Sequence, residues 1–145
     1  MMTTQNKDLQ DEAVILRLIA DQQSAVRAKD VDRIMSHYAA EFAVFNVKPP
    51  FQIRRTEEWR RVWETSLSHF PASFGTETRD LVITTSAGLA VAHYLSRFTG
   101  LPGEPSWIRT TAVYKRMDGG WRIVHEHSSV PFDSETGKAV FALED

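Results

Sequence analysis

The chain has 145 residues, 42% of them hydrophobic, and 19 acidic against 17 basic residues give a net charge of -2. This balance gives no general attraction for nucleic acid or for an anionic membrane, so we expect neither as a partner. The sequence has no cysteine, which excludes disulfides, thiolate metal ligands and cysteine nucleophiles. Length and composition predict one domain over 1–145, and the polar amino terminus, which has no pattern of a targeting segment, predicts a cytoplasmic protein.

The amino-terminal half has helical periodicity. Apolar residues recur at three- and four-residue steps from about 7 to 29, which predicts one long amphipathic helix. Asp30 can accept hydrogen bonds from the first amides of a second, shorter helix. A short strand is predicted over 42–47, because Pro49-Pro50 stops any further ladder, and Thr56 can cap a third helix.

From Phe74 onward, hydrophobic residues recur at every second position, which is typical of β-strands. Turn sequences, of which Asp118-Gly119-Gly120 has the strongest pattern, separate four expected strands. These strands cover about 74–85, 89–100, 106–117 and 120–130. Helices followed by such a meander predict an α+β domain, in which three amino-terminal helices pack on a curved, cone-shaped antiparallel sheet. Its core is expected over about 9–133, with a carboxyl-terminal tail over 134–145.

The order of elements, with Tyr38 at the end of the second helix, and the stretch RTTAVYKRMDGGWRIVHEHSSVP resemble the nuclear transport factor 2-like superfamily. The resemblance is closest to SnoaL-like proteins and to the association domain of calcium/calmodulin-dependent protein kinase II, and it extends to ketosteroid isomerases. It implies a cystatin-like fold with a hydrophobic pocket inside the cone. Because this fold hosts enzymes, binding modules and assembly domains, the activity stays open.

Position-by-position comparison with ketosteroid isomerases bears on the chemistry. Aligning Tyr38 with the corresponding tyrosine of those enzymes puts Asn46 at the general base, and an asparagine cannot take up a proton at neutral pH. One oxyanion donor of the isomerases falls on Gln22, and the other falls near Ala112 or Val113, which cannot donate. The resemblance therefore argues against steroid isomerisation by that set of groups.

The kinase association domain carries pocket arginines at positions that fall here on Leu95, Ala112 and Ser128. If Ser128 faces inward, strand alternation turns Glu126, Val124 and Val130 inward as well. The same alternation predicts that Thr110, Tyr114 and His93 face the cone. The predicted ligand-binding residues are Asn46, Trp59, Trp63, Leu95, Arg97, Ala112, Tyr114, Ser128 and Val130.

Glu126 is the candidate for acid and base chemistry. A carboxyl group inside an apolar cone has a raised pKa, because burial disfavours its charged form, and it can then donate or accept a proton. His93 and Tyr38 are the predicted catalytic partners. The alternative is that Glu126 only pairs with Arg97 or Arg109 across the sheet.

The run His125-Glu126-His127 also raises the possibility of a metal site. Two histidines at i, i+2 on a strand can share a face, but the glutamate between them points the other way. A third ligand would have to be distant, such as His69 or His93. We therefore predict no metal and no cofactor.

The structural interpretation of His125 and His127 is that they lie on the outer face of the sheet. Trp121 and Ile123 are expected beside them, and a second subunit is expected to cover this face, which predicts a homodimer.

Two classes of function follow. The first is a SnoaL-like enzyme that transfers a proton without a cofactor, in an isomerisation or a cyclisation of a small carbonyl compound. The second is a non-catalytic domain that binds a small hydrophobic or weakly acidic ligand, or that serves dimerisation and assembly.

Overall fold

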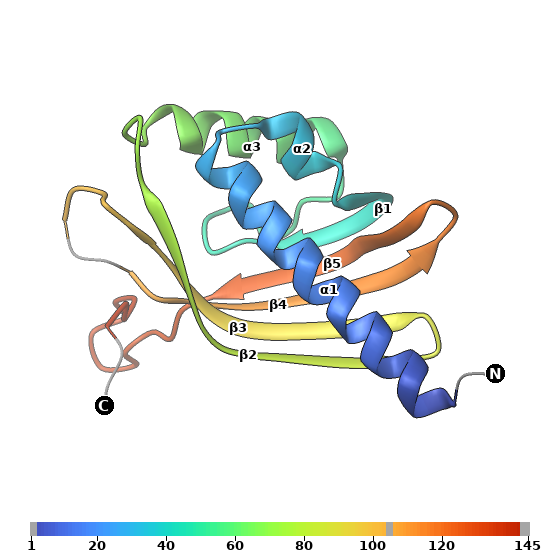
Figure 1. Cartoon of the computed structure of the whole chain (residues 1–145). Helices are drawn as coiled ribbons and strands as arrows, with labels where there is room; N and C mark the ends of the chain where they lie inside the picture. The colour runs from blue at the N-terminus through green and yellow to red at the C-terminus, as the bar shows by residue number, and fades with distance from the viewer. Residues whose placement is uncertain (1–2, 104–105, 143–145) are drawn as a thin grey trace.

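The computed structural model describes residues 3–103 and 106–142, which form three helices and five strands. The helices are α1 (Thr4–Arg27), α2 (Val31–Met35) and α3 (Thr56–Ser68). The strands are β1 (Tyr38–Phe45), β2 (Gly75–Ser86), β3 (Leu89–Thr99), β4 (Ile108–Met117) and β5 (Gly120–Ser129). All three helices lie over one face of a curved, open sheet, and α1 crosses the strands diagonally (Figure 1). The predicted α+β fold is confirmed.

Local side-chain contacts explain where the first two helices begin. The Thr3 hydroxyl accepts a hydrogen bond from the Asn6 amide at 3.2 Å, and the Asp30 carboxylate accepts one from the Arg33 amide at 3.1 Å. Asp30 thus caps α2 as predicted. Thr56 is instead the first residue of α3, whose capping position is Arg55 without a side-chain cap.

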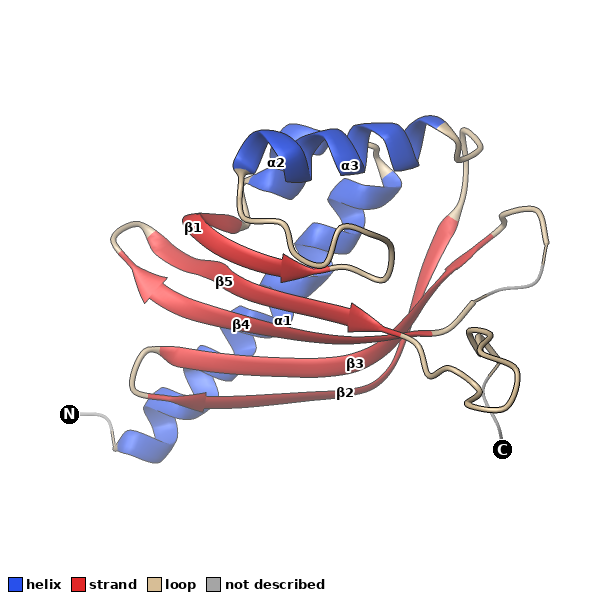
Figure 2. Cartoon of the chain, turned by 180° about the vertical axis from the view of Figure 1, so that it is seen from behind, coloured by secondary structure: helices blue, strands red, loops and turns tan. Residues whose placement is uncertain are grey.

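The strand order is β1-β5-β4-β3-β2, and Figure 2 shows the sheet from the side opposite to that in Figure 1. The pairs β2–β3, β3–β4 and β4–β5 are antiparallel, as a meander predicts. However, β1 runs parallel to β5, so the sheet is mixed rather than wholly antiparallel. This strand also begins earlier than expected, because Tyr38 opens β1 instead of closing the second helix.

The core lies between the helices and the inner face of the sheet. Ile15 and Ile19 of α1, Ile34 of α2 and Trp59 of α3 are buried against it. Burial of such side chains is the main force that holds the helices on the sheet. Of the helices in the part of the chain described, none is long and apolar enough to cross a membrane.

A β-bulge decides which residues of β5 face the core. Tyr114 pairs with Ile123, while the preceding Val113 pairs with His125, so Val124 is an extra residue on β5. Because of this extra residue, Trp121 and Ile123 face the helices on one side of the bulge, and Glu126 does so on the other. The interrupted alternation brings all three side chains to the inner face.

Candidate functional site

Glu126 and Tyr38 meet inside the cone. Both are buried, and the Tyr38 hydroxyl lies 3.1 Å from each carboxylate oxygen of Glu126, to which it donates a hydrogen bond. Tyr38 comes from the first residue of β1, and Glu126 comes from β5, its parallel neighbour. Pairing of the two strands therefore creates this contact.

Glu126 lies in the wall of a cavity of about 530 Å³ between the sheet and the helices, and Tyr38 contacts Glu126 from outside this wall. This size is within the usual range for sites of small organic molecules. Its wall is mainly apolar and aromatic, with contributions from α1, α3 and the inner face of β3, β4 and β5. Lining residues from the helices include Ile19, Gln22, Trp59, Val62 and Trp63, and those from the strands include Tyr94, Phe98, Ile108, Thr110 and Ser128.

Burial dominates the electrostatics of this site. It raises the pKa of Glu126 to about 7, although the hydrogen bond from Tyr38 partly opposes the shift. Burial, and then the nearby charge of Glu126, raise the pKa of Tyr38 well above its usual value. The pKa values of Tyr94 and Tyr114 are raised for the same reasons. Near neutral pH, Glu126 can therefore both accept and donate a proton, while the tyrosines keep theirs.

Two further contacts fix Tyr38. The Gln22 side-chain amide from α1 donates to the Tyr38 hydroxyl at 3.3 Å. The neighbouring Asp21 carboxylate contacts Arg33 at 2.6 Å and His37 Nε2 at 2.8 Å, which ties α1 to the segment that enters β1. Tyr38 is thus held from the helix side, and its proton is directed at Glu126.

The predicted ion pairs of Glu126 do not form. Arg97 binds Glu77 of β2 at 2.7 Å, and Arg109 donates to the Ser129 hydroxyl at 3.2 Å. Among residues 3–103 and 106–142, no lysine, arginine or histidine forms an ion pair with Glu126. The alternative in which Glu126 only balances an arginine is therefore wrong.

The indole nitrogens of Trp59 and Trp63 also lack partners. Both are buried, and neither forms a hydrogen bond of good geometry within the described part of the chain, although the Trp59 indole comes close enough to the Tyr38 hydroxyl to oppose the rise in its pKa. The two rings sit one helical turn apart on α3 and contact edge to face, with ring centroids 5.6 Å apart. Buried donors without partners are uncommon in folded proteins, and here both belong to residues that line the cavity.

Several predicted site residues meet at this cavity. Asn46, Trp59, Trp63, Arg97 and Ser128 line it, together with Glu126. Ala112 and Tyr114 face inward, but they are buried in the core next to it. Val130 follows the end of β5 and is not part of the wall. Val124 is the bulge residue, so its predicted orientation does not follow from alternation.

The predicted inward orientation of His93 and Leu95 is wrong. Ala92 pairs with Ala112, and both are buried, so their side chains mark the inner face. His93 and Leu95 follow Ala92 on β3 by an odd number of residues, so their side chains point to the outer face. Tyr94, Ser96 and Phe98 line the cavity instead. The pairing of Ala92 with Ala112 fixes this orientation, and the sequence pattern alone does not reveal it.

His125 and His127 lie on the outer face, opposite to Glu126. The Phe45 ring contacts both imidazoles edge to face, at centroid distances of 4.8 Å and 5.4 Å, and His125 Nδ1 lies 2.8 Å from the Ala43 carbonyl oxygen. Trp121 and Ile123 were expected beside them, which is wrong, because the bulge turns both into the core. No group of three potential metal ligands occurs among the residues that the structure describes.

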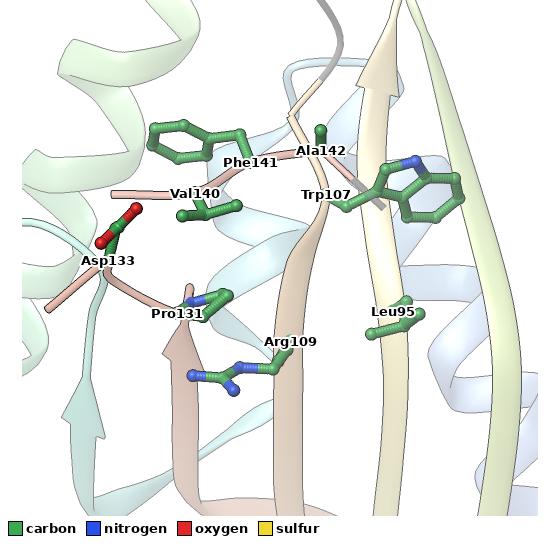
Figure 3. A pocket seen from close by; sticks show the side chains of 8 residues that line it. All are labelled: Leu95, Trp107, Arg109, Pro131, Asp133, Val140, Phe141 and Ala142. Carbon is green, nitrogen blue, oxygen red and sulfur yellow. The ribbon is translucent and has the colours of Figure 1, made fainter. Parts of the chain in front are cut away.

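A second cavity, of about 470 Å³, lies where the carboxyl-terminal segment passes the outer side of the sheet (Figure 3). Leu95, Trp107 and Arg109 line it from the sheet side, and Val140 and Phe141 line it from the segment. The Trp107 amide donates to the Phe141 carbonyl at 3.0 Å, which fastens the segment there. Glu126 is not part of this wall, so the second cavity is separate from the acid and base candidate.

The chain is an α+β domain in which three helices cover the inner face of a curved sheet that carries a buried carboxyl group. The SnoaL-like domain family matches residues 15–133, and the chain belongs to this family. Its fold is similar to that of a nuclear transport factor 2-like protein of unknown function from Pseudomonas putida KT2440. The two are 31% identical with a TM-score of 0.88, over 94% of this chain and 98% of that one.

Two more distant solved structures share the fold. A candidate dehydratase of the same superfamily from Streptomyces avermitilis is 14% identical, with a TM-score of 0.71 over 86% of this chain and 98% of that one. A candidate calcium/calmodulin-dependent protein kinase II association domain from Xanthomonas campestris is 19% identical, with a TM-score of 0.69 over 79% of this chain and 84% of that one. No curated protein matches the chain.

Proposed function

We propose that the protein transfers a proton on a small carbonyl compound, without a cofactor, with Glu126 as the acid and base. The observation that carries this proposal is the enclosed Glu126 carboxyl group at the wall of the cavity, held by Tyr38 and free of any described ion pair. A pKa of about 7 suits a group that must both take up and return a proton near neutral pH.

The reaction balances without an external reagent. The Glu126 carboxylate removes a proton from the carbon next to the carbonyl, and the electron pair of that C–H bond moves into the carbonyl to form an enolate. In a β,γ-unsaturated compound this enolate is a dienolate, and protonated Glu126 returns the proton to its γ carbon, which moves the double bond into conjugation with the carbonyl. Asn46 and Ser128 line the cavity and are the candidates to hold the developing oxygen charge by hydrogen bonds, while Tyr38 holds Glu126 in place. The same first step also begins the dehydration of a β-hydroxy carbonyl compound.

Hydrogen exchange tests this proposal without knowledge of the product. Small ketones and enones are incubated with the protein in deuterated buffer, and NMR records the incorporation of deuterium at the carbon next to the carbonyl. We expect exchange with some compounds, and its loss in Glu126→Gln. His93→Gln on the outer face is the matched control and keeps the exchange. Equal exchange in Glu126→Gln and the unsubstituted protein contradicts the proposal.

The second candidate function is non-catalytic binding of a small hydrophobic or weakly acidic ligand. It is favoured by the unpartnered indole nitrogens of Trp59 and Trp63, which a ligand oxygen would satisfy. A compound that binds in the cavity but shows no deuterium exchange would support this candidate over the enzyme.

We also propose that the protein forms a homodimer through the outer face of the sheet. This face carries exposed side chains, among them Phe45, Val82, His93 and His127. A second copy would bury them in a two-fold interface, where the same patch meets itself.

A further inference from the structure

Within the described part of the chain, the Glu126 carboxyl has no cationic partner in its cavity. Two cationic residues line it, but Arg97 is held by Glu77 at 2.7 Å, and Lys48 is exposed to solvent. The groups that surround the Glu126 carboxyl are neutral: Tyr38 touches it, and Tyr94, Thr110 and Ser128 share its wall. A buried carboxylate ordinarily has a cation as partner, and none of the described side chains supplies one.

Aromatic rings surround the same space. Trp59 contacts both Tyr38 and Trp63, with ring centroids 6.1 Å and 5.6 Å apart, and both contacts are edge to face. Tyr94, Phe70 and Phe98 continue this lining on the other side of the cavity. The faces of such rings carry negative partial charge and attract organic cations, which bind most strongly over tryptophan.

We propose that the cavity binds small organic ammonium ions whose apolar body is an aryl-alkyl group. The ammonium N–H groups would donate to the Glu126 carboxylate beside Tyr38, and the apolar body would lie against Trp59 and Trp63. A carboxylate in a low-dielectric site and π faces both favour a cation over a neutral group of the same shape. An anion at this position would be repelled by Glu126. This binding is independent of the proposed proton transfer, which such a ligand would block by occupying its base.

Three ligands of nearly the same shape test the charge preference: naphthylmethylamine, naphthylmethanol and naphthoate. Calorimetry at pH 8, where Glu126 is mostly ionised, measures the affinity of each for the full chain. We expect the amine to bind roughly ten- to hundredfold more tightly than the alcohol, as a charge-assisted hydrogen bond predicts, and naphthoate to bind most weakly. Equal or tighter binding of the alcohol overturns the proposal.

Two variants distinguish the effect of the Glu126 carboxylate on amine binding from the effect of the overall charge of the protein. Glu126→Gln should abolish the preference for the amine over the alcohol, while Glu41→Gln, which removes an exposed carboxylate on β1, should leave it intact. Circular dichroism checks that both variants are folded. A preference for the amine that persists in folded Glu126→Gln also overturns the proposal.

A measurement on the unsubstituted protein covers the case in which Glu126→Gln does not fold. Carbon NMR of the labelled glutamate side chains follows the titration of Glu126 with and without saturating amine. A bound ammonium ion stabilises the charged carboxylate, so its pKa should fall by about one unit or more, whereas the alcohol should not lower it. An unchanged titration with bound amine contradicts the proposal. Deuterium exchange into carbonyl compounds is measured in the absence of amine. The test of amine binding can therefore fail without contradicting the proposed proton transfer, and the reverse is also true.

Discussion

The Tyr38 hydroxyl donates to both carboxylate oxygens of Glu126, across 88 positions of the sequence. This contact joins the first residue of β1 to the buried part of β5, and it is the link between the fold and the candidate chemistry. A tyrosine that keeps its proton stabilises the ionised form of its partner, so this hydrogen bond limits the rise in the pKa of Glu126 that burial causes.

Removal of the Tyr38 hydroxyl should raise the pKa of Glu126. In Tyr38→Phe the carboxylate loses its donor while its burial is unchanged, so we expect the titration midpoint to move above about 7. Carbon NMR of Glu126 measures the shift, and His93→Gln is the control that should leave the midpoint in place. A lower midpoint in Tyr38→Phe would show that the hydroxyl does not act as the donor.

The stability of the protein should fall as the pH rises through the titration of Glu126. Its folded-state pKa of about 7 is above the ordinary value of 4.5, so between these values the folded state binds more protons than the unfolded state. The stabilising contribution is complete below pH 4.5, declines up to about pH 7, and is lost above it. Its size is on the order of 3 kcal/mol, at about 1.4 kcal/mol per pKa unit.

Denaturant unfolding at several pH values measures this effect as a difference between the unsubstituted protein and Glu126→Gln. The subtraction is needed because other groups act in the opposite direction. Asp21, for example, has a pKa lowered mainly by its hydrogen bond to Arg33. Curves of the two proteins that remain parallel from pH 4 to pH 8 would contradict a buried, titrating Glu126.

The spacing of hydrophobic residues predicted most of the helices and strands, because this spacing reflects which face of each element is buried. The strand boundaries from Gly75 onward agree with the predicted segments to within a few residues. The orientation of β3 was not predictable in this way. The inward prediction came from the position of Leu95 in the resemblance to the association domain. The hydrophobic pattern could not correct it, because the inner positions include the small residues Ala90 and Ala92, while the larger Leu89 and Leu95 face outward.

Two features of the site were also beyond the sequence pattern. The parallel pairing of β1 with β5 depends on the path of the whole chain, and it moves Tyr38 from a helix end to a strand end. The bulge at Val124 interrupts a run that otherwise alternates. The inward position of Glu126 was nevertheless predicted, because the alternation was counted from Ser128, on the same side of the bulge.

A single charge on the outer face should prevent association if this face forms the dimer interface. Val113 pairs with Val91 and His125 there, and it is half-buried in the isolated chain. Val113→Glu should therefore turn a dimer into a monomer in sedimentation experiments at micromolar concentration, because an interface cannot bury an unpaired carboxylate without a large cost. Glu41→Gln is the matched control. A monomeric unsubstituted protein would rule out this interface.

The extra residue in β5 has a consequence for how this cavity could change. If Val124 were built into a regular strand instead of a bulge, with Trp121 and Ile123 kept in the core, Glu126 would turn to the outer side and His125 and His127 toward the cavity. The same residues would then present imidazoles in place of a carboxyl group. The identity of the ionisable group in the cone thus depends on how β5 pairs at one position as much as on residue type.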